Sequence, residues 1–186
     1  MRKGFTLVEL ILVVGMLVAI IIVSAYVFRV VLTNWVSQDA RAGIGLVADR
    51  AINAVNKDVR EATALRQKNL HEIRFTLKDR QSDGTPIAGL FLHCIYYLYN
   101  SADGYPPNFK QSAYDLKRAV LNNVVGTDLT TGTFTYGSGA LLADGILPPN
   151  ASDLAVNGST ATVDLSIKKG SETMRTRTSA VARNVL

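Results

Sequence analysis

The sequence predicts an α+β protein in which a long N-terminal helix precedes an antiparallel β-sheet. No proline occurs before Pro86, and the apolar residues ahead of it recur at helical spacing. Beyond about residue 72 the pattern changes to apolar and polar alternation, broken by turns rich in glycine and proline. The 186 residues are enough for one domain and an anchor.

The chain begins with a segment that is apolar enough to cross a membrane. Arg2 and Lys3 precede an apolar stretch over 5–28, and residues 10–23 carry no polar side chain. A helix that spans a bilayer needs about 20 such residues, at a rise of about 1.5 Å each. Because basic residues ahead of a span favour a cytoplasmic N-terminus, the chain beyond Arg29 is expected outside the cytoplasm.

One carboxylate, Glu9, interrupts this apolar segment. By insertion scales, an acid at the centre of a span costs roughly 2.5 to 3.5 kcal/mol, and less near its edge, so an acid placed there usually has a partner. A plain signal anchor and a secretory signal peptide cleaved before Tyr26 are the alternatives that the span alone allows. Glu9 argues against both alternatives.

The residues around Glu9 resemble a known motif. The run Lys3-Gly4-Phe5-Thr6-Leu7-Val8-Glu9-Leu10 is similar to the prepilin cleavage and methylation motif of type IV pilins and type II secretion pseudopilins. This resemblance implies that a prepilin peptidase cuts after Gly4, that Phe5 becomes the N-methylated terminus, and that Glu9 pairs with the terminal amine of a neighbouring subunit. In an apolar bundle, such a cation would offset the desolvation of the carboxylate and fix the axial register.

Helical periodicity continues beyond the apolar segment. The membrane-spanning half of the helix is expected over 5–29 and its second half over 30–66. Gly43 and Gly45 are expected to loosen the second half locally, because glycine is a poor helix former. The apolar stripe recurs mainly at steps of three and four residues. It comprises Trp35, Ile44, Val47, Ala51, Val55, Val59, Ala62 and Leu65.

The antiparallel sheet is predicted over 67–186, with the second half of the helix covering one of its faces. The strand that begins at Ile73 alternates strictly and is expected to be half-buried. Between Gly126 and Gly158, irregular loops with short strands are expected. The main strands are predicted near 73–78, 89–100, 113–120, 163–167 and 173–180.

The globular part of the chain that follows the membrane-spanning segment, here called the body, is similar in its order of elements to minor pilins and J-type pseudopilins. The similarity rests on short motifs at 58–62, 95–98, 115–118 and 183–184. The resemblance implies a structural subunit, a minor one, of a type IV pilus or type II secretion pseudopilus. Its expected partners are other pilin or pseudopilin subunits, the prepilin peptidase, the inner-membrane assembly platform and, before assembly, membrane lipid. The expected location is the inner membrane, crossed once with the C-terminal domain outside the cytoplasm, and then the filament.

Other functions find less support in the sequence. Cys94 is the only cysteine, so neither an intrachain disulfide nor a cysteine zinc cluster can form. His93 and Cys94 are neighbours on a strand and point to opposite faces, so no catalytic dyad, enzyme activity, metal or cofactor is predicted. Arg175 and Arg177 share one strand face, which leaves a DNA-binding or adhesive tip subunit as the alternative, although a solvated face is favoured.

Overall fold

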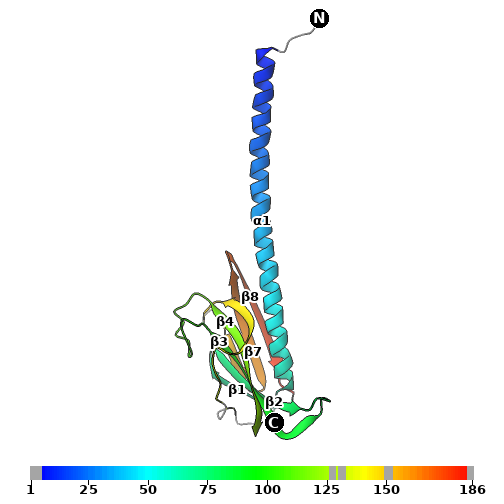
Figure 1. Cartoon of the computed structure of the whole chain (residues 1–186), viewed down its shortest axis with the longest axis vertical. Helices are drawn as coiled ribbons and strands as arrows, with labels where there is room; N and C mark the ends of the chain where they lie inside the picture. Colours follow the sequence, from blue (N-terminus) through cyan, green and yellow to red (C-terminus); the bar gives the residue numbers. More distant parts are fainter. Residues whose placement is uncertain (1–5, 126–128, 130–132, 149–152, 184–186) are drawn as a thin grey trace. The chain divides into compact units, whose positions relative to one another are not determined.

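The computed structural model describes residues 6–125, 129, 133–148 and 153–183. Along them, helix α1 (Leu7–Glu61) is followed by the strands of one antiparallel sheet (Figure 1). This arrangement confirms the predicted α+β class. The strands are β1 (Ala64–Asn69), β2 (Glu72–Arg80), β3 (Pro86–Tyr99), β4 (Tyr114–Val125), β5 (Ala140–Ile146), β6 (Asp153–Asn157), β7 (Thr160–Lys169) and β8 (Glu172–Val181).

The chain divides into two compact units, 1–40 and 41–186. Of the first unit the structure describes residues 6–40, none of which is buried. Its large apolar side chains are exposed, including Leu10, Ile20 and Phe28. The most apolar window of α1 has a mean hydropathy of 3.0, so the helix is long and apolar enough to cross a membrane.

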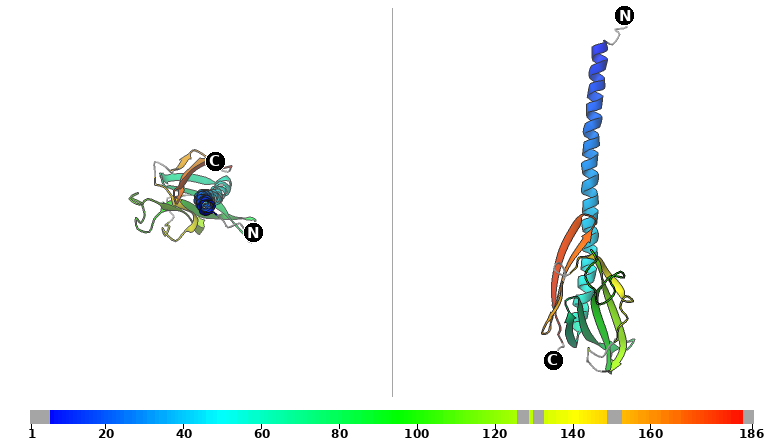
Figure 2. Two further views of the ribbon diagram at one scale, coloured as in Figure 1. Left: turned by 90° about the horizontal axis from the view of Figure 1, so that it is seen from above. Right: turned by 90° about the vertical axis from the view of Figure 1, so that its left-hand side faces the viewer.

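The sheet of the second unit curls until its ends approach each other. Its strands run in the order β1-β2-β3-β4-β5-β7-β6, and β8 pairs with β7. The Leu154 amide on β6 donates to the Leu70 carbonyl oxygen (3.1 Å), and the Val156 amide donates to Gln67 Oε1 on β1 (3.0 Å). Figure 2 shows the sheet bending round from the green strands to the orange strands beside the second half of α1.

The core lies between the second half of α1 and this curled sheet. The helix contributes a buried stripe at steps of three and four residues, as the periodicity predicts. Trp35, which belongs to the predicted stripe, is instead 74% exposed in the first unit. The buried stripe is Ile44, Ala48, Ala51, Val55 and Val59, and the large buried side chains that the sheet contributes to this core include Ile73, Phe75, Tyr96, Leu98, Tyr114 and Leu116.

Helix α1 continues through Gly43 and Gly45. A Cβ atom added at Gly43 would lie 2.7 Å from the Nζ atom of Lys169, whereas nothing lies within 4 Å of the same position at Gly45. Gly43 therefore gives the Lys169 side chain room to pass across the helix, and the two neighbouring glycines are not equivalent.

The helix ends at Glu61, five residues short of the predicted boundary at residue 66. The Ala62 amide closes the last turn on the Val59 carbonyl oxygen (3.1 Å), and the Thr63 amide donates to the Thr76 carbonyl oxygen on β2 (2.8 Å). Leu65 then lies opposite Phe75 in β1. The sheet therefore begins at Ala64, because pairing with β2 outweighs a helical pattern that Leu65 also satisfies.

The prediction of a half-buried β2 is wrong, since both faces of its first half are buried. Ile73 and Phe75 face the core, as expected. On the other face, the Arg74 guanidinium pairs with Glu72 and donates to the Leu129 carbonyl oxygen (3.1 Å) and the Tyr136 hydroxyl (3.1 Å). Charged groups tolerate burial when they are paired in this way. The alternation of apolar and polar residues along β2 cannot reveal that other segments of the chain cover its polar face.

A chain that starts at Arg41 is predicted to fold without a membrane and to remain a soluble monomer. Its buried side chains begin at Ile44, so deletion of 1–40 removes no core residue that the structure describes. Circular dichroism in detergent-free buffer and size-exclusion chromatography with light scattering check this prediction. A chain starting at Val55 is the control, because it lacks three residues of the buried helix stripe and is expected to be unfolded. An unfolded chain from Arg41 would contradict the architecture.

Candidate functional site

The carboxylate of Glu9 is held in the first turn of α1 by Thr6. The Thr6 amide donates to Glu9 Oε2 (3.0 Å), and the Glu9 amide donates to Thr6 Oγ1 (3.3 Å). The Thr6 hydroxyl also donates to Glu9 Oε2 (3.0 Å). This reciprocal arrangement is a capping box, in which the two side chains satisfy amides that the helix start leaves without partners.

Sequence reasoning gave Glu9 a role between chains and missed this role within the chain. The signal was present, because a threonine followed three residues later by glutamate ahead of an apolar run is the pattern of a capping box. The predicted processing residues Gly4 and Phe5 lie outside the described residues. Phe5 nevertheless precedes Thr6 directly in the chain. The Thr6 amide that holds the Glu9 carboxylate is therefore one residue from the predicted new terminus.

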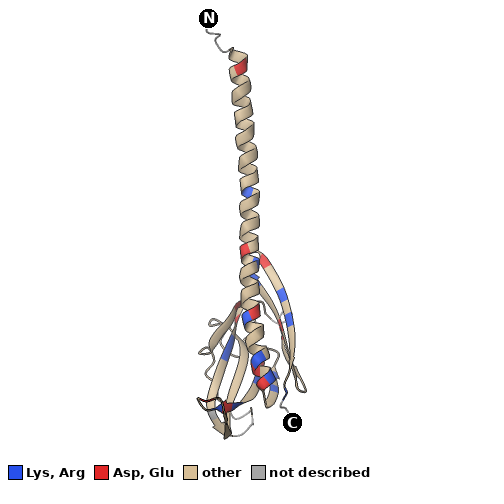
Figure 3. Cartoon of the chain, turned by 90° about the vertical axis from the view of Figure 1, so that its right-hand side faces the viewer, with Lys and Arg blue, Asp and Glu red and all other residues tan. Residues whose placement is uncertain are grey.

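The helix surface next to Glu9 is apolar and uncovered. Leu7 is 74% exposed, and the exposed apolar side chains continue to Phe28. Figure 3 shows few charged residues along the first part of α1, in contrast to the mixed charges on its second half. A surface of this kind can be stable in lipid or against other apolar helices.

A second polar cluster fixes the last part of α1 to the sheet. Asp58 Oδ2 accepts hydrogen bonds from the Tyr96 hydroxyl on β3 (2.8 Å) and from Arg118 Nε on β4 (2.7 Å). Burial raises the pKa of the Tyr96 phenol far above its ordinary range, and the neighbouring Asp58 carboxylate adds to this shift. We call Asp58, Tyr96 and Arg118 the helix–sheet clasp.

The clasp was not predicted from the sequence. Each of its members falls in one of the short motifs at 58–62, 95–98 and 115–118 on which the resemblance of the body rests. Nothing in their sequence spacing reveals the contact, since it depends on the register between β3 and β4, which places Tyr96 opposite Arg118. The motifs are thus joined by one contact between the helix and the sheet.

The two residues considered for catalysis, Cys94 and His93, are buried within the folded protein. The Cys94 side chain is buried in the core, and burial raises its pKa to about 12, so the thiol stays protonated at neutral pH. His93, its neighbour on β3, is buried as well. Among the residues that the structure describes, no three or more His, Cys, Asp or Glu side chains are grouped to hold a metal ion.

Part of the positive charge on the basic face of β8 is paired with a carboxylate of the neighbouring strand. Arg175 binds Asp164 on β7 through two hydrogen bonds, from Nε to Oδ1 (2.9 Å) and from the terminal nitrogen Nη2 to Oδ2 (2.8 Å). These bonds hold the pKa of Asp164 below its ordinary value. Arg175 therefore has a carboxylate partner, and Arg177, which lies opposite Asp164 in the register of β7 and β8, also contributes to lowering the pKa of that carboxyl.

Comparison with known proteins gave no match: no family model fits the chain, and neither a curated protein nor a solved structure is detectably similar to it.

Proposed function

We propose that the chain is a structural subunit, and a minor one, of a type IV pilus or type II secretion pseudopilus, and not an enzyme. The observation that carries the proposal is the position of Glu9. This carboxylate is fixed at the first turn of an apolar and exposed helix segment, directly after the Gly4-Phe5 junction of the prepilin-like motif. An acid on such a surface is expected to need a cationic partner from another molecule.

The proposed mechanism starts in the inner membrane, with the first part of α1 in lipid and residues 41–186 outside the cytoplasm. A prepilin peptidase removes residues 1–4 and leaves a charged amine on Phe5. During transfer from lipid into the filament, Glu9 pairs with the Phe5 amine of a neighbouring subunit. An ion pair in apolar surroundings is favourable only with good geometry, so it would select one axial register.

The clasp suits a subunit of this kind. Mechanical force on a filament subunit acts on its helix, so the force on α1 must be transmitted to the body. Asp58 joins the helix to two strands through charge-assisted or buried hydrogen bonds, and these resist displacement better than apolar contacts, which are not directional.

The alternative, a DNA-binding or adhesive tip subunit, receives less support. Arg175 is paired with Asp164, and Lys169 passes across Gly43, so the face considered for DNA is not a row of unpaired cations. Phosphate binding depends on such cations.

The proposal is tested by the mature terminus of the protein. When the full chain is expressed with a prepilin peptidase, intact-mass and N-terminal peptide spectrometry are expected to find a chain that begins at Phe5 and carries one added methyl group. Gly4→Val is the matched variant and should stay uncut, because a side chain there keeps the protease from the peptide bond. A terminus at Tyr26 would instead identify a secretory signal peptide, and an intact Met1 in the native chain would identify a plain anchor.

A further inference from the structure

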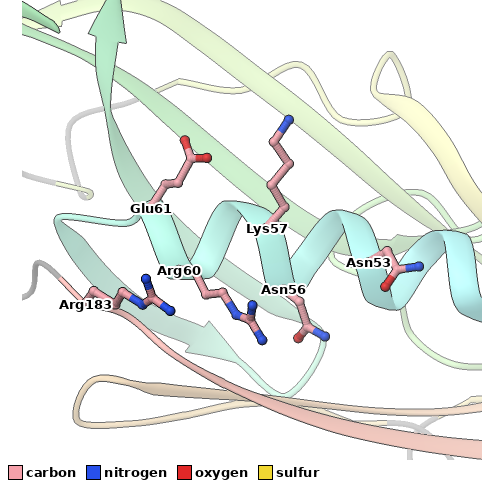
Figure 4. A pocket seen from close by; sticks show the side chains of 6 residues that line it. All are labelled: Asn53, Asn56, Lys57, Arg60, Glu61 and Arg183. Atoms are coloured by element: carbon pink, nitrogen blue, oxygen red, sulfur yellow. The ribbon is translucent and has the colours of Figure 1, made fainter.

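A pocket of about 430 Å³ opens beside the last turns of α1 (Figure 4). Its wall is polar and is formed by the helix and by the chain just beyond β8. The volume falls in the range of pockets that hold a small ligand or a protruding side chain. The lining residues are Asn53, Asn56, Lys57, Arg60, Glu61 and Arg183.

The charges of this pocket are unbalanced. Its one carboxylate, Glu61, lies 3.7 Å from a guanidinium nitrogen of Arg80 and so already has a cation. Within the part of the chain that the structure describes, the side chains of Lys57, Arg60 and Arg183 make no hydrogen bond or ion pair. Among the described residues, Lys57, Arg60 and Arg183 therefore have no acidic partner, and of these Arg60 and Arg183 lie on one side of α1 (Figure 4).

Two of these cations are brought together by the backbone. The Arg183 amide donates to the Arg60 carbonyl oxygen (3.5 Å), and the preceding residue, Ala182, is buried and donates its amide to the Ser159 carbonyl oxygen (2.8 Å). In Figure 4 the guanidinium groups of Arg60 and Arg183 lie on the same side of α1. The fold thus places the backbones of these two arginines side by side, with both side chains on one side of the helix.

Asn56 completes this side of the pocket. Its amide nitrogen donates to Thr178 Oγ1 on β8 (3.3 Å), which ties the amide to the sheet. Figure 4 shows the Asn56 side chain beside that of Arg60, whereas Lys57 and Glu61 point the other way. Two guanidinium groups and one anchored amide therefore face the same space.

We propose that this pocket binds a carboxylate group between Arg60 and Arg183. Guanidinium groups match a carboxylate with two parallel hydrogen bonds, and a bound anion would relieve the repulsion between the two cations. Glu61 points away from this space and is paired with Arg80, so it does not oppose a bound anion. The carboxylate comes from an acidic side chain of another protein chain or from a free carboxylic acid. This inference does not depend on the proposed function.

The test uses the full chain in neutral detergent micelles at low salt, titrated separately with acetate, a glutamate-rich peptide and inorganic phosphate. Binding is followed by the backbone amide signals of the residues that line the pocket in NMR spectra. The variant Arg60→Ala with Arg183→Ala is expected to weaken carboxylate binding by about tenfold or more, since it removes charge-assisted hydrogen bonds. Arg50→Ala with Arg177→Ala loses the same charge away from the pocket and should bind as the native chain does.

Each outcome decides the proposal. Saturable binding of the peptide alone supports a protein side chain as the source, and binding of acetate alone supports a free acid. No saturable binding, equal weakening in both double variants, or phosphate binding as tight as carboxylate binding would overturn it. If circular dichroism shows that the alanine pair misfolds, Arg60→Gln with Arg183→Gln replaces it, because glutamine keeps the length of the stem and removes the charge.

Discussion

Asp58→Ala is expected to lower the free energy of unfolding of the body by about 2 to 4 kcal/mol. The substitution leaves the buried Tyr96 hydroxyl and the partly buried Arg118 guanidinium without their shared acceptor. Removal of one partner of a buried ion pair typically costs about 3 to 5 kcal/mol, and the side chain of Arg118 is 29% exposed, which reduces the loss. Urea unfolding of the chain from Arg41, followed by circular dichroism, measures it.

Matched variants separate the clasp from a general effect on the helix. Asp49→Ala changes an exposed acid on the same helix and is expected to alter stability by no more than about 0.5 kcal/mol. Tyr96→Phe removes one hydrogen bond and should cost about 1 kcal/mol. A double-mutant cycle between Asp58→Ala and Arg118→Ala should return a coupling energy of about 1 to 3 kcal/mol. Equal losses in Asp58→Ala and Asp49→Ala would show that the clasp does not stabilise the body.

Much of the body could be predicted because its elements have strong local patterns. The helix stripe from Ile44 to Val59 survives into the structure, since it reports a buried face of the helix. β7 and β8 form where alternation predicts strands, although Asp164 and Ser166 on the polar face of β7 are buried too, and β8 alternates mostly between half-buried and exposed positions. β1 could not be predicted, because its six residues follow the helix directly and its apolar residues also fit the helical period. Only pairing with β2 decides whether these residues continue the helix or form a strand.

The sites show a different limit. The capping contact of Glu9 was predictable, because it links residues three apart on one turn. The clasp and the pocket were not, because they join residues that are far apart in the sequence, such as Asp58 with Arg118 and Arg60 with Arg183. Contacts of that kind follow from sheet register and from the curl of the sheet, which the pattern of one chain segment does not contain.

The largest functional effect is expected at Glu9, where Glu9→Leu and Glu9→Gln should both reduce entry into filaments by about tenfold or more. Leucine removes the carboxylate and makes membrane insertion easier, so the chain should still accumulate in the membrane. Glutamine removes only the charge and can keep the capping box, since its side-chain oxygen still accepts from the Thr6 amide. Equal failure of the two variants would therefore assign the effect to the charge and not to the helix start.

Thr6→Ala is the matched control, because it removes the hydroxyl that caps the helix and leaves the carboxylate in place. It is expected to assemble far better than either Glu9 variant. Immunoblots compare each variant in the membrane and in sheared filaments, and mass spectrometry verifies cleavage after Gly4. If both Glu9 variants are cleaved, accumulate normally and still enter filaments at the native level, Glu9 does not pair with a neighbour. A subunit at the filament tip has no neighbour above it, so its own Glu9 has no amine to pair with. Its Phe5 amine is still required by the Glu9 carboxylate of the subunit below, and for a tip subunit this amine is the group to test.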